Sequence, residues 1–108
     1  LIGLASSSNR HLVDDILDAL GIADYFSYTV SGEEIASKKP APDVYNKVLS
    51  LAGVSAADAC AVEDSAAGIA AAKAAGIYCF GYNNPTSKGQ NQSEADCIID
   101  NLIQVISK

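Results

Sequence analysis

The sequence contains no methionine and no tryptophan, and it has only one histidine, two phenylalanines and five tyrosines among its 108 residues. A complete translation product that keeps its initiator contains methionine, and this chain opens directly on an apolar run at residues 1–5. We therefore expect the chain to be part of a longer protein. Its length suffices for the core of one small domain.

Further absences exclude several classes of protein. No apolar run is long enough to cross a bilayer, and no segment has the pattern of a signal peptide. The net charge is −6, and no basic patch is interleaved with aromatic residues, so nucleic acid is a poor candidate as a partner. We expect a cytoplasmic protein that binds neither membranes nor nucleic acid.

The three cysteines lack the spacing of a metal or redox site. Cys60, Cys79 and Cys97 include no C-x-x-C pair, and the single histidine, His11, is distant from them in the sequence. Each cysteine lies within a short apolar run. We therefore expect buried, unreactive thiols that pack as small hydrophobic side chains.

The chain is rich in short apolar runs that alternate with helical periods, and 49% of its residues are hydrophobic. Strands are expected at residues 1–5, 28–30, 60–63, 77–80 and 97–99, and helices at residues 9–20, 42–52, 65–75 and, as a last turn, 102–106. The first helix carries its apolar residues on one face: Leu12, Val13, Ile16, Leu17 and Leu20. This alternation predicts an α/β fold with parallel strands and crossover helices, whose ligands bind beyond the carboxyl ends of the strands.

Three serines, Ser6, Ser7 and Ser8, follow the first expected strand and precede the first helix. Hydroxyl groups and free backbone N–H groups at the start of a helix favour a tetrahedral anion such as phosphate. Simple capping of the helix explains the same residues, and both interpretations stay open.

A lysine pair, Lys38 and Lys39, stands immediately before Pro40-Ala41-Pro42 and the second helix. Two prolines restrict the backbone and therefore fix the direction of Lys39. A lysine held in this way suits neutralisation of a phosphate or of an adjacent carboxylate. A solvated pair of lysines on a turn is the alternative, and Lys38 is expected to be no more than that.

Two adjacent carboxylates, Glu63 and Asp64, end the third expected strand. Oxygen ligands in this position suit Mg²⁺, which binds one or two carboxylates and keeps several waters. Alternatively, both acids favour the start of the helix that follows. Gly68, one turn later, suggests that this helix closely approaches a neighbouring segment.

Together these segments have the parts that phosphoryl transfer needs: donors for the transferred oxygens, a cation and carboxylates for a metal. Residues 4–8, 37–43 and 62–69 resemble the second, third and fourth motifs of the haloacid dehalogenase superfamily, and they are closest to its β-phosphoglucomutase-like branch. The resemblance covers almost the whole chain, in order. It implies a Rossmann-like doubly wound parallel sheet, of which residues 1–108 form the C-terminal part of the core domain.

The resemblance also implies roles for the residues near the first helix. Ser6 would hydrogen-bond the transferring phosphoryl group, with the amide of Ser7 beside it. Ser8, Asn9 and Arg10 would contact the far end of the substrate, where Arg10 could meet a second phosphate.

The other two motifs imply the charged parts of the site. Lys39 would stabilise a nucleophilic aspartate and the phosphoryl charge, which makes it, with Ser6, a candidate catalytic residue. Glu63 and Asp64 would hold Mg²⁺ directly or through water.

Two parts of the resembling enzymes have no counterpart in the sequence. The first motif, D-x-D-G, supplies the nucleophile and the acid/base aspartate, and the pair Asp14-Asp15 lies within a helix in the wrong pattern. The cap domain that selects the substrate is also missing. The first-motif strand would lie between the strands at residues 1–5 and 60–63, so we expect an incomplete sheet. The chain should be inactive alone and should need the N-terminal half of the same protein, or a second copy, to complete the sheet.

The full-length protein is therefore expected to be a magnesium-dependent phosphatase or phosphomutase. It would act on a small phosphorylated metabolite, with a sugar phosphate favoured, through an aspartyl-phosphate whose aspartate lies upstream. Two alternatives stay open. One is a non-catalytic module that binds a phosphorylated ligand or regulates a partner, and the other is an unrelated doubly wound domain of receiver or nucleotide-binding type.

Overall fold

The computed structural model describes residues 1–85 and 89–105. Its strands are β1 (Gly3–Ala5), β2 (Tyr28–Val30), β3 (Cys60–Glu63), β4 (Tyr78–Tyr82) and β5 (Cys97–Ile99), and its α-helices are α1 (Arg10–Leu20), α2 (Asp43–Ala52) and α3 (Ala66–Ala74). Short 3-10 turns lie at Ala23–Tyr25, Gly32–Glu34, Ala56–Asp58 and Leu102–Val105. The predicted alternation of strands and helices is confirmed.

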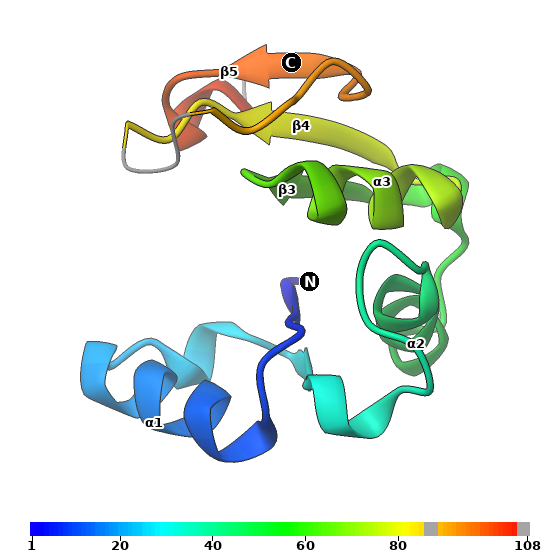
Figure 1. Ribbon diagram of the computed structural model, residues 1–108. Coiled ribbons are helices and arrows are strands. Elements are labelled where there is room, and N and C mark those ends of the chain that lie inside the picture. The colour runs from blue at the N-terminus through cyan, green and yellow to red at the C-terminus, as the bar shows by residue number, and fades with distance from the viewer. Residues whose placement is uncertain (86–88, 106–108) are drawn as a thin grey trace.

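The strands form two parallel sheets. β1 pairs with β2, and β3, β4 and β5 pair in that order. Within the described residues β1 and β3 are not paired with each other, and Figure 1 shows the two sheets as separate halves of the molecule, with α2 beside the passage from one to the other. The expected α/β fold with an incomplete parallel sheet is therefore confirmed.

The ends of the helices follow from their capping residues. Asn9 caps α1 by accepting a hydrogen bond from the amide of Leu12, and Ser65 caps α3 in the same way from Gly68. Gly21 ends α1 and Gly53 ends α2, with φ of 67° and 68°. Glycine adopts this left-handed conformation at little cost in free energy. The two helices therefore end where the glycines in the sequence predict.

One core spans both sheets. Its buried residues come from β2, α2, β3, α3, β4 and the residue just before β4: Val30, Val44, Tyr45, Ala61, Ile69, Ala71, Ala72, Ile77 and Cys79. Helix α2 packs on β1 and β2 and also contacts α3, which packs on β3 and β4. The small alanines of α3 allow this close approach. The shared core therefore joins the two sheets although no hydrogen-bonded ladder does.

The expectation that all three cysteines are buried holds for Cys79 but is wrong for Cys60 and Cys97. Cys79 is buried, and burial raises the pKa of its thiol to about 11, with the charge of Glu63 adding to the effect. Cys60, in contrast, is exposed, because it begins β3 at an edge of the three-stranded sheet. Cys97 is only partly buried.

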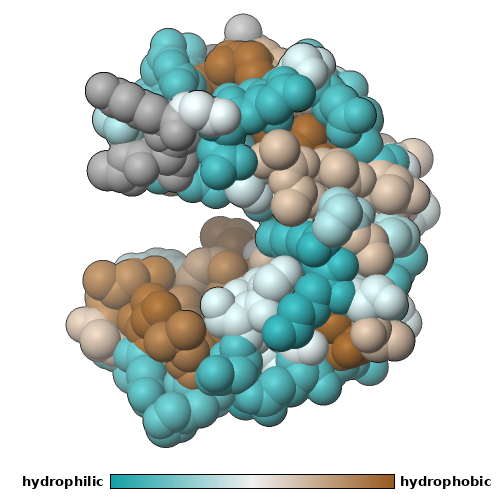
Figure 2. Space-filling model, viewed as in Figure 1, coloured by the Kyte–Doolittle hydropathy of each residue, from teal (hydrophilic) through white to brown (hydrophobic). Residues whose placement is uncertain are grey.

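The apolar face of α1 is also only half covered. Val13 and Leu17 are buried, but Leu12, Ile16 and Leu20 are exposed. Figure 2 shows the molecule hollowed between its two halves, with hydrophobic side chains gathered over α1 at one side of the opening. None of the helices in the described ranges is long and apolar enough to span a membrane.

Candidate active site

Lys39 joins the ends of the two sheets. Its Nζ donates a hydrogen bond to the carbonyl oxygen of Ala5, at the end of β1, over 3.0 Å. The same Nζ lies 2.6 Å from Oε2 of Glu63, at the end of β3. Both side chains are largely buried, with 14% of the lysine and 10% of the glutamate exposed, so this ion pair is well shielded from solvent. The lysine of one sequence motif therefore forms an ion pair with the glutamate of another motif, 24 residues later in the chain.

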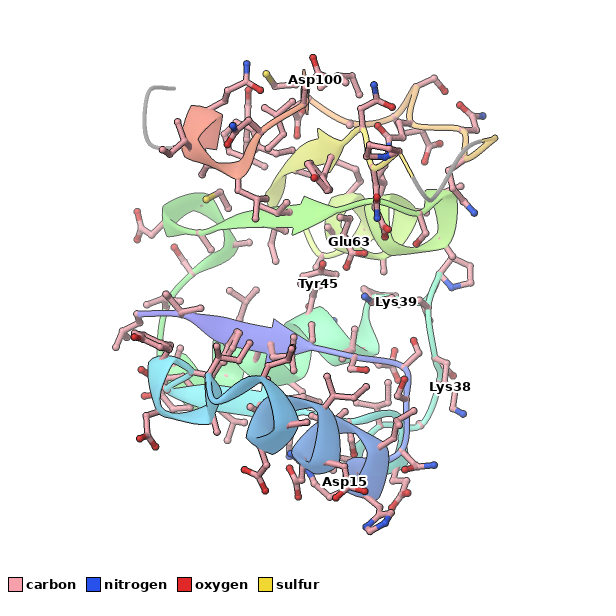
Figure 3. The ribbon with its side chains drawn as sticks, turned by 90° about the vertical axis from the view of Figure 1, so that its left-hand side faces the viewer. Asp15, Lys38, Lys39, Tyr45, Glu63 and Asp100 are labelled. Atoms are coloured by element: carbon pink, nitrogen blue, oxygen red, sulfur yellow. The ribbon has the colours of Figure 1, made fainter. Side chains whose placement is uncertain are left out.

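The turn before α2 places this lysine. The Lys39–Pro40 peptide bond is cis, and the amide of Ala41 donates to the carbonyl of Lys38. Figure 3 shows Lys39 pointing toward Glu63, whereas Lys38 lies away from it on the outside of the molecule.

Gly68 allows α3 to lie against the carboxylate of Glu63. A Cβ atom built on Gly68 would overlap the carboxylate oxygen Oε1. The close approach suggested by this glycine is confirmed, and the neighbouring segment is the end of β3. Glu63 is therefore held between Lys39 on one side and the backbone of α3 on the other.

The serine turn rests on the turn that follows β2. Ser6 Oγ accepts a hydrogen bond from the amide of Ser8 over 3.0 Å, and the carbonyl of Ser8 accepts one from Gly32 over 2.7 Å. A side chain at position 32 would overlap the carbonyl of Ser7. Glycine at this position lets the two turns lie in contact.

The capping alternative for the serines does not describe this turn, because Asn9 caps α1. Ser7 Oγ is buried, and among the described residues it has no hydrogen-bond partner. A buried hydroxyl without a partner is costly. The turn therefore holds one polar group that a ligand or an ordered water would satisfy.

Arg10 binds protein groups. Its guanidinium donates to Glu34, to Thr29 through both the side-chain and the carbonyl oxygen, and to Asp14. The hydrogen bond from Arg10 is the main cause that lowers the pKa of Glu34, which also closes a capping box with Ser31. Arg10 thus ties the first turn of α1 to β2, and a phosphate would have to compete with Glu34 for it.

Asp64 is bound by the loop that follows β4. Asn84 donates to Asp64 Oδ2 over 3.3 Å, and Gln92 Nε2 donates to the carbonyl of Asp64 over 3.0 Å and to that of Tyr82 over 2.7 Å. Gln90 accepts from the amide of Ala66 at the start of α3. The loop after β4 therefore contacts the acidic end of β3 through Asn84 and Gln92.

Residues 1–82 match the family model described as haloacid dehalogenase-like hydrolase. The chain belongs to this family. The alternative of an unrelated receiver or nucleotide-binding domain is therefore wrong.

Relatives and solved structures show how far the likeness extends. The chain is 39% identical over 98 residues to β-phosphoglucomutase from Bacillus subtilis (strain 168), covering 91% of this chain and 41% of that protein. It is 34% identical over 107 residues to phosphoglycolate phosphatase from Yersinia pseudotuberculosis, covering 97% and 46%. Crystal structures of CbbY from Rhodobacter sphaeroides, one with phosphate and one of a mutant with xylulose-1,5-bisphosphate, each match with a TM-score of 0.83 at 30% identity, covering 91% of this chain and 45% of that one. The chain spans about half the length of these haloacid dehalogenase-like relatives.

The predicted site residues of this haloacid dehalogenase-like chain come together only in part. Ser6 follows Ala5, so Lys39 brings the serine turn and Glu63 to one place. Arg10 instead binds Glu34 and Thr29. Asp15, which the sequence excludes from the site, lies far from Glu63 on α1, where it pairs with the exposed His11 (Figure 3). In residues 1–85 and 89–105, no cluster of three or more histidine, cysteine, aspartate or glutamate side chains could hold a metal.

Sequence reasoning missed two residues of the site. The hydroxyl of Tyr45 donates a hydrogen bond to Glu63 Oε2, and Gln92 Nε2 donates one to the carbonyl of Asp64. No spacing rule reveals either contact, although a tyrosine on a buried helix face always raises the question of where its hydroxyl is bonded.

Proposed function

We propose that these residues are part of a magnesium-dependent phosphatase or phosphomutase of the haloacid dehalogenase-like family. The observation that carries the proposal is the contact of Lys39 with both the end of β1 and Glu63 at the end of β3. It gathers a cation, a carboxylate and a serine turn at the carboxyl ends of parallel strands, where ligands bind in such folds.

The serine turn is the proposed phosphate site. Ser6 and the buried hydroxyl of Ser7 would donate to the transferred phosphoryl oxygens, with Ser8 and Asn9 toward the rest of the substrate. The charge of Lys39 would offset the negative charge that builds up during transfer. For Arg10 a contact with a second phosphate stays a prediction, because the guanidinium is bonded to Glu34 here.

Glu63 and Asp64 are the proposed ligands of Mg²⁺. Their hard oxygen atoms fit a cation that takes one or two carboxylates and keeps waters, and a dedicated cage of protein ligands is not needed. Glu63 Oε2 accepts from Lys39 and Asp64 Oδ2 accepts from Asn84, so Mg²⁺ would share each carboxylate with a protein donor. When bound, Mg²⁺ would supply positive charge to the phosphoryl oxygens.

The nucleophile is proposed to be an aspartate outside these 108 residues. Its carboxylate oxygen would bond to phosphorus as the ester bond breaks, and water or a second substrate oxygen would then accept the phosphoryl group. We propose that residues 1–108 are the C-terminal part of the core domain. A further strand, from the rest of the protein or from a second copy, would lie between the open edges of β1 and β3. A cytoplasmic location stays a prediction.

A sugar phosphate is the proposed substrate class. The relatives include a β-phosphoglucomutase, and CbbY binds xylulose-1,5-bisphosphate in its crystal structure. A phosphoglycolate phosphatase is similarly related, so the test must include both kinds of compound. Hydrolases and mutases share the parts described here and differ in the acceptor of the phosphoryl group.

The decisive experiment measures phosphate release and phosphoryl transfer by the full-length protein. The panel contains glucose phosphates, a pentose bisphosphate and phosphoglycolate, each with Mg²⁺ or with EDTA. We expect magnesium-dependent turnover, and we expect Lys39→Met to lower kcat about 100-fold or more. Lys38→Met, a matched change on the outside of the same turn, should leave kcat unchanged.

A folding control accompanies this test, because Lys39→Met leaves Glu63 buried without its cation. The double variant Lys39→Met/Glu63→Gln removes both charges, and it should fold and remain inactive. Equal activity of Lys39→Met and Lys38→Met would refute the assigned role of Lys39. Tight binding of sugar phosphates without any turnover would instead favour the non-catalytic, ligand-binding alternative.

A further inference from the structure

Tyr45 lies in the first turn of α2 with its hydroxyl among charged groups. The side chain is buried, with 8% of the residue exposed, and it belongs to the core that joins the two sheets. Its hydroxyl donates a hydrogen bond to Oε2 of Glu63. Figure 3 shows Tyr45, Lys39 and Glu63 converging from α2, the preceding turn and the end of β3.

The same tyrosine contacts the lysine of the pair. Nζ of Lys39 lies 5.5 Å from the centroid of the Tyr45 ring, within the range in which a cation is attracted to an aromatic face. The ring thus lies beside the ammonium group while the hydroxyl binds the carboxylate that the ammonium also binds. One side chain therefore fixes both members of the ion pair.

Glu63 has little freedom to lie elsewhere. Its Oε2 accepts from Lys39 and Tyr45, and its Oε1 lies against Gly68. Without the hydroxyl, Lys39 would be the one remaining donor to Oε2 that the structure shows. The carboxylate would then be held by Lys39 and by its contact with Gly68 alone among these groups.

The hydroxyl acts as a donor. Burial, followed by the negative charge of Glu63, raises the pKa of Tyr45 well above its ordinary value. A phenol that is hydrogen-bonded to a carboxylate donates its proton to the bond, so the hydroxyl of Tyr45 orients Glu63 Oε2.

We infer that Tyr45 is a positioning residue for the proposed phosphoryl transfer. Its side chain holds the Glu63 carboxylate, at the end of β3, next to the Lys39 ammonium that binds the end of β1. The effect that we expect on kcat rests on the proposed function. The contact of Tyr45 with Glu63 does not, and it can be measured separately.

The kinetic test compares Tyr45→Phe with Tyr25→Phe in the full-length protein. Phenylalanine keeps the ring, its packing and its contact with the cation, and removes only the hydroxyl. Tyr25 is a matched control because it is 70% exposed. We expect Tyr45→Phe to lower kcat about tenfold with KM changed less than twofold, because a hydrogen bond to a charged group is lost. Tyr25→Phe should behave as wild type.

The second readout needs no substrate. In nitrogen-15 NMR, the hydrogen-bonded ammonium of Lys39 should give a slowly exchanging signal in wild type and in Tyr25→Phe. In Tyr45→Phe this signal should exchange faster and shift, together with the carboxyl carbon signal of Glu63. Circular dichroism establishes that both variants are folded.

The outcomes separate the two hypotheses. If wild type turns over nothing on the panel but the Lys39 and Glu63 signals change in Tyr45→Phe, the proposed function fails and the positioning contact stands. If turnover is present and Tyr45→Phe changes neither kcat nor these signals, the inference about Tyr45 is overturned. Unfolding of Tyr45→Phe alone would also overturn it, because the hydroxyl would then serve the fold and not the site.

Discussion

Gly68 is the residue at which helix α3 comes against the carboxylate of Glu63. Helix propensity alone would make Gly68→Ala stabilising by about 1 kcal/mol. The added methyl group, however, would overlap Glu63 Oε1 and push the carboxylate away from Lys39. We therefore expect the opposite sign, a loss of about 1–3 kcal/mol in the free energy of unfolding, measured by urea unfolding of the full-length protein.

Ala67 supplies the control for this prediction. It is exposed on the same turn of α3, so Ala67→Gly reports the propensity difference without a contact at the site. A more stable Gly68→Ala protein would show that Glu63 moves at no cost, and the description of a tightly held carboxylate would then be wrong.

At the scale of single residues, the sequence predicts which chemical groups are present better than it predicts what they bind. The motifs around Lys39 and Glu63 stand out because two prolines bracket a single residue and because two acids are adjacent. Glu34 and Thr29 as partners of Arg10, and Glu63 as the partner of Tyr45, do not stand out, because these contacts join residues 18 to 24 positions apart. Such contacts follow from the packing of whole elements, which no local pattern contains.

Asp96 connects three elements of the second sheet. Its carboxylate accepts from Lys73 of α3 over 2.7 and 2.9 Å and from the amide of Cys79 in β4 over 2.7 Å, just before β5 begins. The hydrogen bond from Lys73, followed by that from Cys79, lowers the pKa of Asp96 below 3.8. The charged form of Asp96 therefore stabilises the junction of α3, β4 and β5.

The pH dependence of this contribution has a definite sign. Because the pKa is lowered in the folded state, the stabilisation is fully present above about pH 3.8 and is lost as the pH falls through the folded pKa. We expect Asp96→Asn to lower the free energy of unfolding at pH 6 and to differ less from wild type as the pH drops below 3.8. Urea unfolding across this range measures the difference, and a gap that stays constant with pH would contradict the assignment.

At the scale of elements, the sequence predicts most boundaries because their signals are local. Asn9, Ser65, Gly21 and Gly53 act at the helix ends where they stand. What the sequence does not show is how an element is covered. Helix α1 was expected to carry one apolar face, yet Leu12, Ile16 and Leu20 are exposed, and amphipathic spacing alone cannot tell which neighbours pack against that face.

At the scale of the whole molecule, three surfaces are open among residues 1–85 and 89–105: one edge of β1, one edge of β3 and the apolar stripe of α1. Unpaired strand edges and exposed apolar patches are features that proteins usually cover. Figure 1 shows the two sheets in separate halves of the molecule, and Figure 2 shows hydrophobic side chains over α1 at one side of the opening between these halves. A parallel strand with flanking apolar residues would satisfy the edges and the stripe at once, in agreement with the proposed position of the segment that carries the nucleophile.

This arrangement predicts that the 108-residue chain alone gives no magnesium-dependent phosphate release above background on the panel that the full-length protein is tested with. The serine turn, Lys39 and Glu63 would be present, but the carboxylate oxygen that attacks phosphorus would not. Release of inorganic phosphate, with Mg²⁺ and with EDTA, measures this directly, and the full-length protein is the control. Turnover by the short chain that EDTA stops and Lys39→Met abolishes would show instead that these residues contain a complete catalytic centre, and the proposed external aspartate would have to be abandoned.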